Sequence, residues 1–184
     1  MEVYLDNAAT TSLDPEVLNA MLPYFTELYG NPSSQHSAGR SVRSAIEDAR
    51  KKIAQIINAQ PGDIVFTSGG TESNNTILKG AVRDLGVKHI ITSVIEHHCV
   101  SHTVEYLEKN DQIKLTILPV NENGQIIISE LEKALADSTE KTLVTLIHAN
   151  NEIGVMIDID QVARICKSYG AYFHSDTVQT FAHY

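Results

Sequence analysis

The chain has 184 residues, of which 42% are hydrophobic, and its 14 basic and 23 acidic side chains give a net charge of −9. This length is sufficient for one domain with a buried core. The acidic balance, with no cluster of Lys or Arg, argues against binding to nucleic acid or to an anionic membrane surface. No apolar run has the length of a membrane span, and Met1–Leu5 does not resemble a signal peptide. Two cysteines make no disulfide framework, so we expect a cytoplasmic protein with reduced thiols.

The first third of the sequence predicts two helices. Pro15, which follows the potential cap Asp14, is suited to the first position of a helix whose apolar residues recur at helical spacing. Pro23 should kink or loosen this helix. A long amphipathic helix is expected from about Ala38 until Gln60–Gly62 breaks it.

From residue 64 onward, short apolar runs alternate with helical stretches. The runs, each a candidate strand, are Ile64–Thr67, His89–Thr92, Leu115–Val120, Leu143–His148 and Ala171–His174. The expected helices between them are Glu72–Leu85, Cys99–Lys109, Ser129–Ala136 and Ile159–Tyr169. This alternation predicts an α/β fold with a mainly parallel sheet and helices on both faces. In such sheets ligands collect at the carboxyl ends of the strands, where the polar clusters of this sequence fall.

Two of these clusters leave more than one interpretation open. Gly69 and Gly70 could let the backbone approach a phosphate at a helix N-terminus, or they could simply form a turn with a capping Ser or Thr. Hydroxyl donors near them are Ser68, Thr71 and Ser73. His98 and His102 are spaced to share a helix face and allow a zinc site, a helix start with solvated histidines, or an imidazole stacked on a flat ring.

Two further clusters follow later runs. Asn150 and Asn151 could hold a carboxylate or phenolate oxygen, or they could form a turn together with Gly154. Asp176 could cap the next helix or pair with a protonated heterocyclic nitrogen, since a buried carboxylate needs a positive partner. A phosphate cradle, a stackable His, a polar Asn and a buried Asp are the parts that a pyridoxal phosphate site needs.

Six blocks in chain order resemble the cysteine desulfurases of the IscS/NifS type, in the class V aminotransferase group. They are YLDNAATT (Tyr4–Thr11), GNPSSQH (Gly30–His36), FTSGGTESNN (Phe66–Asn75), EHH (Glu96–His98), NNEIG (Asn150–Gly154) and HSDTVQ (His174–Gln179). The resemblance implies the fold type I of pyridoxal-phosphate-dependent transferases. It also implies release of sulfur from L-cysteine to give L-alanine and an enzyme persulfide, for iron–sulfur cluster or other sulfur delivery.

The resemblance also implies roles for single residues. Gly70 and Thr71 would hold the cofactor phosphate, and His97 would stack on the pyridine ring and assist proton transfers as the catalytic residue. Asn151 would lie beside the ring hydroxyl oxygen and the substrate, and Asp176 would pair with the pyridine nitrogen. The ring hydroxyl oxygen would also be reached by Gln179, and the substrate end would be lined by Ala8, Thr10 and Asn31. No metal ligand is implied, and His98, His102 and both cysteines are expected to be structural.

The family is about twice as long as this chain. Its Schiff-base lysine, in a Ser-x-His-Lys block, and its persulfide cysteine lie beyond the position that matches Tyr184. After Gln179 the sequence also departs from the family pattern, with Ala182 in place of a glycine. We therefore expect residues 16–184 to be the N-terminal portion of the large cofactor-binding domain. Residues 1–15 would contribute to the active-site edge or to the small domain.

The isolated chain is accordingly expected to be inactive. We expect a second polypeptide that carries the C-terminal half, a homodimer of the completed enzyme, and a sulfur acceptor protein as partners. Alternative interpretations are a related class V enzyme, such as a selenocysteine lyase or an aminotransferase, and a non-catalytic scaffold that kept the fold.

Overall fold

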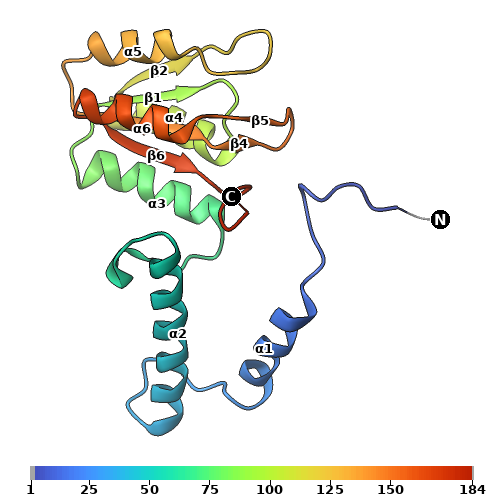
Figure 1. Ribbon diagram of the computed structural model, residues 1–184. Helices are drawn as coiled ribbons and strands as arrows, with labels where there is room; N and C mark the ends of the chain where they lie inside the picture. The colour runs from blue at the N-terminus through green and yellow to red at the C-terminus, as the bar shows by residue number, and fades with distance from the viewer. Residues whose placement is uncertain (1–2, 184) are drawn as a thin grey trace. The chain divides into compact units, whose positions relative to one another are not determined.

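The computed structural model describes residues 3–183 and divides the chain into two compact units, one ending at Phe66 and the other beginning at Thr67 (Figure 1). The N-terminal unit contains α1 (Pro15–Thr26), α2 (Ser37–Ile56) and a short 3-10 helix, η1 (Pro61–Asp63). The second unit contains α3 (Gly70–Arg83), β1 (His89–Ser93), α4 (His98–Asp111), β2 (Lys114–Leu118), α5 (Ile128–Ala136), β3 (Thr142–Ile147), β4 (Ala149–Asn150), β5 (Val155–Met156), α6 (Ile159–Ser168) and β6 (Tyr172–Asp176). These bounds confirm the expected helices and all but one of the expected strands.

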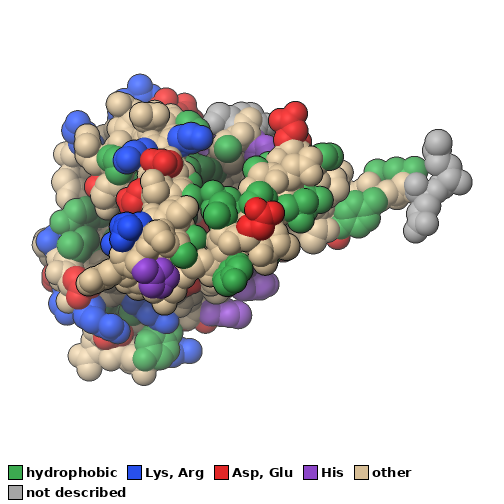
Figure 2. Space-filling model, turned by 90° about the horizontal axis from the view of Figure 1, so that it is seen from below, with side chains coloured by type: hydrophobic (Ala, Val, Ile, Leu, Met, Phe, Trp, Pro, Cys, Tyr) green, Lys and Arg blue, Asp and Glu red, His purple; other side chains and the backbone are tan. Residues whose placement is uncertain are grey.

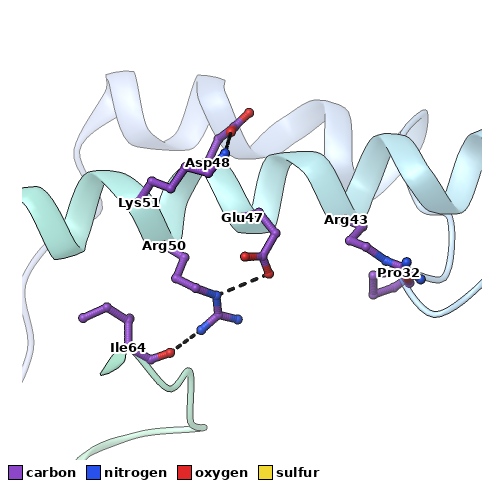
Figure 3. A network of polar contacts seen from close by, with 7 residues as sticks. All are labelled: Pro32, Arg43, Glu47, Asp48, Arg50, Lys51 and Ile64. Carbon is purple, nitrogen blue, oxygen red and sulfur yellow. Dashed lines mark hydrogen bonds and ion pairs between the residues drawn. The ribbon is translucent and has the colours of Figure 1, made fainter. Parts of the chain in front are cut away.

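The prediction of a strand at Ile64–Thr67 is wrong. The structure describes all of these residues, and they form an irregular connection without sheet pairing. Arg50 on α2 donates a hydrogen bond to the carbonyl of Ile64, and its guanidinium carbon lies 4.8 Å from the centroid of the Phe66 ring. Contacts with a helix therefore replace the strand neighbours that the apolar run predicted (Figure 3).

Helix α2 holds the surrounding loops by side-chain hydrogen bonds (Figure 3). Arg43 Nε donates to the carbonyl of Pro32 at 2.7 Å, on the loop that precedes the helix. Two pairs of oppositely charged side chains, each 3.3 Å apart, lie along the helix at a spacing of three residues: Arg50–Glu47 and Lys51–Asp48. Pairs of this kind on a helix surface each contribute about 0.3–0.5 kcal/mol to stability.

The second unit is built on a parallel sheet with the strand order β2-β1-β3-β6. The chain leaves β1 toward β2 on one side and then returns to β3 on the other side of β1. Strand order therefore reverses between β1 and β3, which is the position where open α/β sheets form ligand crevices at their carboxyl ends. The register pairs Ile147 at the end of β3 with Asp176 at the end of β6.

Helices cover both faces of this sheet (Figure 1). Neighbouring residues of a strand point to opposite faces, and accordingly Ile90 and Ile91, both fully buried, belong to different hydrophobic clusters. The first cluster joins β1 and β3 to α3 and α4, and the second joins the sheet to α5 and α6. No helix among the described residues is both long and apolar enough to cross a membrane.

Candidate functional site

Hydrogen bonds connect the loop after β1 with the loop after β3 at the point where strand order reverses. Glu96, in the loop after β1, accepts hydrogen bonds through Oε1 from Ser93 Oγ at 2.5 Å and from the backbone amide of Ile147 at 3.1 Å. Asn150 Nδ2 donates to the carbonyl of Ile95 at 2.8 Å. These contacts bring together two of the polar clusters, those that follow β1 and β3, at the carboxyl ends of their strands.

Asp176, the last residue of β6, is only 6% exposed. Its Oδ2 accepts a hydrogen bond from Asn74 Nδ2 at 2.7 Å, and its Oδ1 accepts one from the backbone amide of Val178 at 3.0 Å. Among the described residues no Lys or Arg forms an ion pair with it. A buried carboxylate that is held by neutral donors suits a cationic ligand group, because such a group would supply the missing opposite charge.

A cavity of about 330 Å³ lies beside this carboxylate, which is within the usual size of small-molecule sites. It is lined by the loop that precedes α3, the first turns of α3, the end of β6 and the turn after it. Gly70 belongs to this lining, and a Cβ added to it would lie 2.5 Å from Val178 Cγ2. A side chain at position 70 would therefore have to displace the Val178 side chain, and the helix N-terminus beside the cavity is suited to an anion.

Two of the three hydroxyls expected near the glycines form hydrogen bonds between the loop before α3 and the first turn of the helix. Ser68 donates from its amide at 2.7 Å and from its hydroxyl at 2.6 Å to Glu72 Oε2, and these bonds lower the pKa of Glu72, the hydroxyl more than the amide. Ser73 Oγ lies 2.7 Å from Thr67 Oγ1. Thr71 is exposed in the first turn of α3. The backbone amides of this turn and the Thr71 hydroxyl are therefore the donors best suited to a phosphate.

His97 is the N-cap of α4 and is exposed. Its Nδ1 accepts a hydrogen bond from the backbone amide of Cys99 at 3.2 Å and lies 3.0 Å from Cys99 Sγ. His98 and His102 stack on each other with ring centroids 5.3 Å apart. The part of the chain that the structure describes contains no group of three or more His, Cys, Asp or Glu side chains placed to hold a metal ion.

The remaining expected residues have the following surroundings within their own units. Asn151 is exposed in the turn after β4, and Gln179 is half-buried in the turn after β6. In the N-terminal unit, Ala8 and Thr10 lie in the segment before α1, where Thr10 Oγ1 is 2.6 Å from the Tyr4 hydroxyl. Asn31 Oδ1 accepts a hydrogen bond from the amide of Ser33 at 2.8 Å. Of the expected residues that the structure describes in the second unit, Gly70 and Asp176 are the ones that line the cavity.

Three further polar residues of the site were not singled out by the sequence, namely Asn74, Glu96 and His174. Burial raises the pKa of Glu96 to about 7, against the lowering effect of its bonds from Ser93 and Ile147, and its Oε2 has no hydrogen-bond partner among the described residues. Burial also lowers the pKa of His174, whose Nδ1 lies 2.8 Å from Thr145 Oγ1. Each residue lies inside a motif noted above, but spacing does not show which side chains those motifs bring together.

The fold and this site define the class of protein. The family described as Aminotransferase class-V matches residues 3–184, and the chain belongs to it. Members of this family depend in general on pyridoxal phosphate. The observed site fits that group, because it combines a buried carboxylate, a cavity and a glycine-flanked helix N-terminus.

Particular relatives are cysteine desulfurases. The chain is 50% identical over 184 residues to "Cysteine desulfurase IscS" of Dictyoglomus turgidum, covering 99% of this chain and 46% of that protein. Among solved structures, a "NifS-like protein" superimposes with a TM-score of 0.91 at 39% identity, covering 98% of this chain and 50% of that one. "SspA in complex with cysteine" superimposes with a TM-score of 0.88 at 35% identity, covering 95% and 50%. The chain thus spans about half the length of the curated relatives it matches.

Proposed function

We propose that this chain is the cofactor-holding part of a pyridoxal-phosphate-dependent cysteine desulfurase. The enzyme would release sulfur from L-cysteine, leaving L-alanine and an enzyme persulfide for iron–sulfur cluster or other sulfur delivery. The observation that carries the proposal is the Asp176 carboxylate, which is buried at the end of β6 beside a cavity and accepts hydrogen bonds from the neutral donors Asn74 and Val178. The desulfurase relatives and the neighbour solved with cysteine support the choice of substrate.

When bound, pyridoxal phosphate supplies an electron sink for the substrate's α-carbon. Asp176 would hold a proton on the ring nitrogen through its negative charge, which an aqueous site could not do as strongly. Gly70 and Thr71 would bind the phosphate at the N-terminus of α3. His97 would stack on the ring and carry protons, with Asn151 and Gln179 at the ring hydroxyl oxygen. Ala8, Thr10, Asn31 and Asn151 would line the substrate end.

The two covalent functions of such an enzyme require residues outside the matched half. None of the lysines in this sequence follows Ser-x-His, and neither Cys99 nor Cys166 has the family's nucleophile context. Cys166 is also buried, which raises the pKa of its thiol to about 11 and disfavours the reactive thiolate. We therefore propose that turnover needs the C-terminal half, in the same polypeptide or in a second one.

The same proposal covers the organisation of the completed enzyme. Residues 1–15 would contribute to the active-site edge or to the small domain, and residues 16–184 would form the N-terminal portion of the large domain. The completed enzyme would be a cytoplasmic homodimer that passes sulfur to an acceptor protein.

The test compares the 184-residue chain alone with the chain completed by the C-terminal half of the Dictyoglomus turgidum relative. Binding of pyridoxal phosphate is followed by its visible absorption, and turnover by the alanine formed from L-cysteine. We expect alanine only from the completed protein, and a loss of at least about 100-fold on Asp176→Asn. Asp158→Asn, at the cap of α6, makes the same change away from the cavity and should leave turnover unaltered.

Each of the other outcomes would contradict a different part of the proposal. Alanine formed by the 184-residue chain alone would contradict the need for a second half. Turnover of selenocysteine without turnover of cysteine would indicate a selenocysteine lyase, and amino-group transfer to a keto acid would indicate an aminotransferase. A completed protein that binds no pyridoxal phosphate would be a scaffold.

A further inference from the structure

Asn74, on α3, is a buried polar residue that contacts two other elements of the second unit. It is 3% exposed. Its Nδ2 lies 2.7 Å from Asp176 Oδ2 at the end of β6 and 3.2 Å from Cys99 Sγ on α4. One amide nitrogen therefore connects two residues that are 25 and 102 positions away in the sequence.

The two contacts fix which way the amide points. A carboxylate oxygen only accepts hydrogen bonds, so the atom that faces Asp176 must be the amide nitrogen, not the amide oxygen. The nitrogen carries two hydrogens, and Asp176 and Cys99 each offer an acceptor for one of them. Rotation of the amide by 180° would place its oxygen against the carboxylate and lose the bond to Asp176. The orientation of Asn74 is therefore determined by its surroundings.

The position of the carboxylate is determined in turn. Asp176 Oδ1 is held by the Val178 amide at 3.0 Å and Oδ2 by Asn74 at 2.7 Å, so both oxygens have a fixed donor. Donors to an ionised group give shorter and stronger hydrogen bonds than neutral pairs do. The Val178 bond is local, two residues along the chain, whereas the Asn74 bond comes from the helix whose N-terminus flanks the cavity.

We propose that Asn74 is a positioning residue that orients the Asp176 carboxylate toward the ring nitrogen of the bound cofactor. This inference rests on the proposed function and deepens it. Through Asn74, helix α3 would provide both the helix N-terminus for the phosphate and the donor that aligns the carboxylate for the ring. The distance between these two parts of the site is then set by one rigid helix.

The test is a double-mutant cycle on the affinity of the completed protein for pyridoxal phosphate. Asn74→Leu keeps the approximate volume of the side chain and removes both donors. We expect it to raise the dissociation constant about tenfold, since it removes one hydrogen bond to a charged group. In the Asp176→Asn background the same change should have no further effect beyond about twofold, because Asn74 would act through Asp176. A general loss of folding would instead weaken binding equally in both backgrounds.

Thr103→Val is the matched control. Thr103 is also buried, on α4, and its Oγ1 donates to Asn75 Oδ1 at 3.1 Å and to the carbonyl of Cys99 at 2.8 Å, so these hydrogen bonds do not involve the Asp176 carboxylate. We expect this variant to lower the thermal midpoint about as much as Asn74→Leu while leaving the dissociation constant within about twofold.

A second measurement decides the proposal if Asn74→Leu does not fold. In the protein without cofactor, the side-chain amide signals of Asn74 in an NMR spectrum should shift on Asp176→Ala and not on Asp158→Ala. An unchanged Asn74 signal, or an additive double-mutant cycle, would overturn the inference. Failure of the completed wild-type protein to bind pyridoxal phosphate would overturn the proposed function instead, and the signal shift would still report the Asn74–Asp176 bond.

Discussion

Each of the two units of the chain is stabilised internally by different interactions. In the sheet unit, residues such as Leu78, Ile90 and Val144 are completely buried in two continuous clusters. In the N-terminal unit, Gly39 and Ala54 are the buried residues among those described. Burial of apolar area therefore dominates the sheet unit, whereas caps, ion pairs and side-chain bonds to loop carbonyls carry more of the N-terminal unit.

Helix α1 makes the contrast plain, because its apolar residues have the spacing of a buried face but none of its described residues is buried. Leu18 is 43% exposed and Phe25 is 68% exposed. Hydrophobic side chains are visible at the surface among charges of both signs (Figure 2). Periodicity thus predicts the helix correctly, but it does not predict that the apolar stripe is covered within the chain.

The largest expected effect comes from a core residue of the sheet unit. Ile90→Ala removes a completely buried side chain from β1 and should lower the free energy of unfolding by about 2–5 kcal/mol. Leu18→Ala in α1 removes a similar side chain that is already partly in water, so its cost should stay below about 1 kcal/mol. Urea unfolding measures both. Equal costs at the two sites would mean that Leu18 is covered in solution.

The next effect concerns the buried carboxyl of Glu96. Its pKa is raised by burial to about 7 from 4.5, so the folded state binds the proton more tightly than the unfolded state. The contribution of Glu96 to stability is therefore fully present below pH 4.5 and is lost as the pH rises through 7. The full loss is about 3 kcal/mol.

Glu96→Gln removes this pH dependence, because its amide oxygen can still accept the bonds from Ser93 and Ile147 but the side chain does not titrate. Relative to this variant, the wild type should lose about 3 kcal/mol of stability between pH 4 and pH 8, measured by urea unfolding at each pH. Glu132→Gln, exposed on α5, is the control for the loss of one charge. Parallel pH curves for wild type and Glu96→Gln would contradict a raised pKa.

Local features of the sequence predicted local features of the structure. Asp14, the potential cap before Pro15, does cap α1, and Gly124 has a φ of +75°, where glycine is favoured. Ala182, which replaces a family glycine, adopts a φ of +65° in the left-handed region where glycine is favoured. Each of these depends on a few neighbouring residues, whose preferences can be read directly from the sequence.

The site depends on contacts between distant residues, and here the sequence was less informative. The motifs were found, but the Asn74–Asp176 and Glu96–Ile147 bonds depend on which strands are neighbours in the sheet. Hydrophobic periodicity identifies a strand and not its place in the order β2-β1-β3-β6. The strand predicted at Ile64–Thr67 was wrong for the same reason. An apolar run does not specify whether a sheet or a helix covers it.

The smallest expected effect is the loss of a helix cap. One such substitution in each unit tests how far the two units differ. Asp14 accepts a bond from the amide of Glu16 at 2.7 Å at the start of α1, and Asp158 accepts one from the amide of Gln161 at 2.8 Å at the start of α6. Replacing either Asp by Ala should cost about 1 kcal/mol of local helix stability.

The consequences should differ because α6 is anchored by the buried residues Val162 and Cys166, whereas none of the described residues of α1 is buried. Asp158→Ala should therefore lower the urea midpoint of the sheet unit. Asp14→Ala should instead speed hydrogen exchange of the α1 amides about fivefold, with the sheet amides unchanged. If Asp14→Ala lowered the sheet unit's midpoint as much as Asp158→Ala, α1 would have to unfold together with the sheet, and its exposed apolar face would then be part of the same cooperative unit.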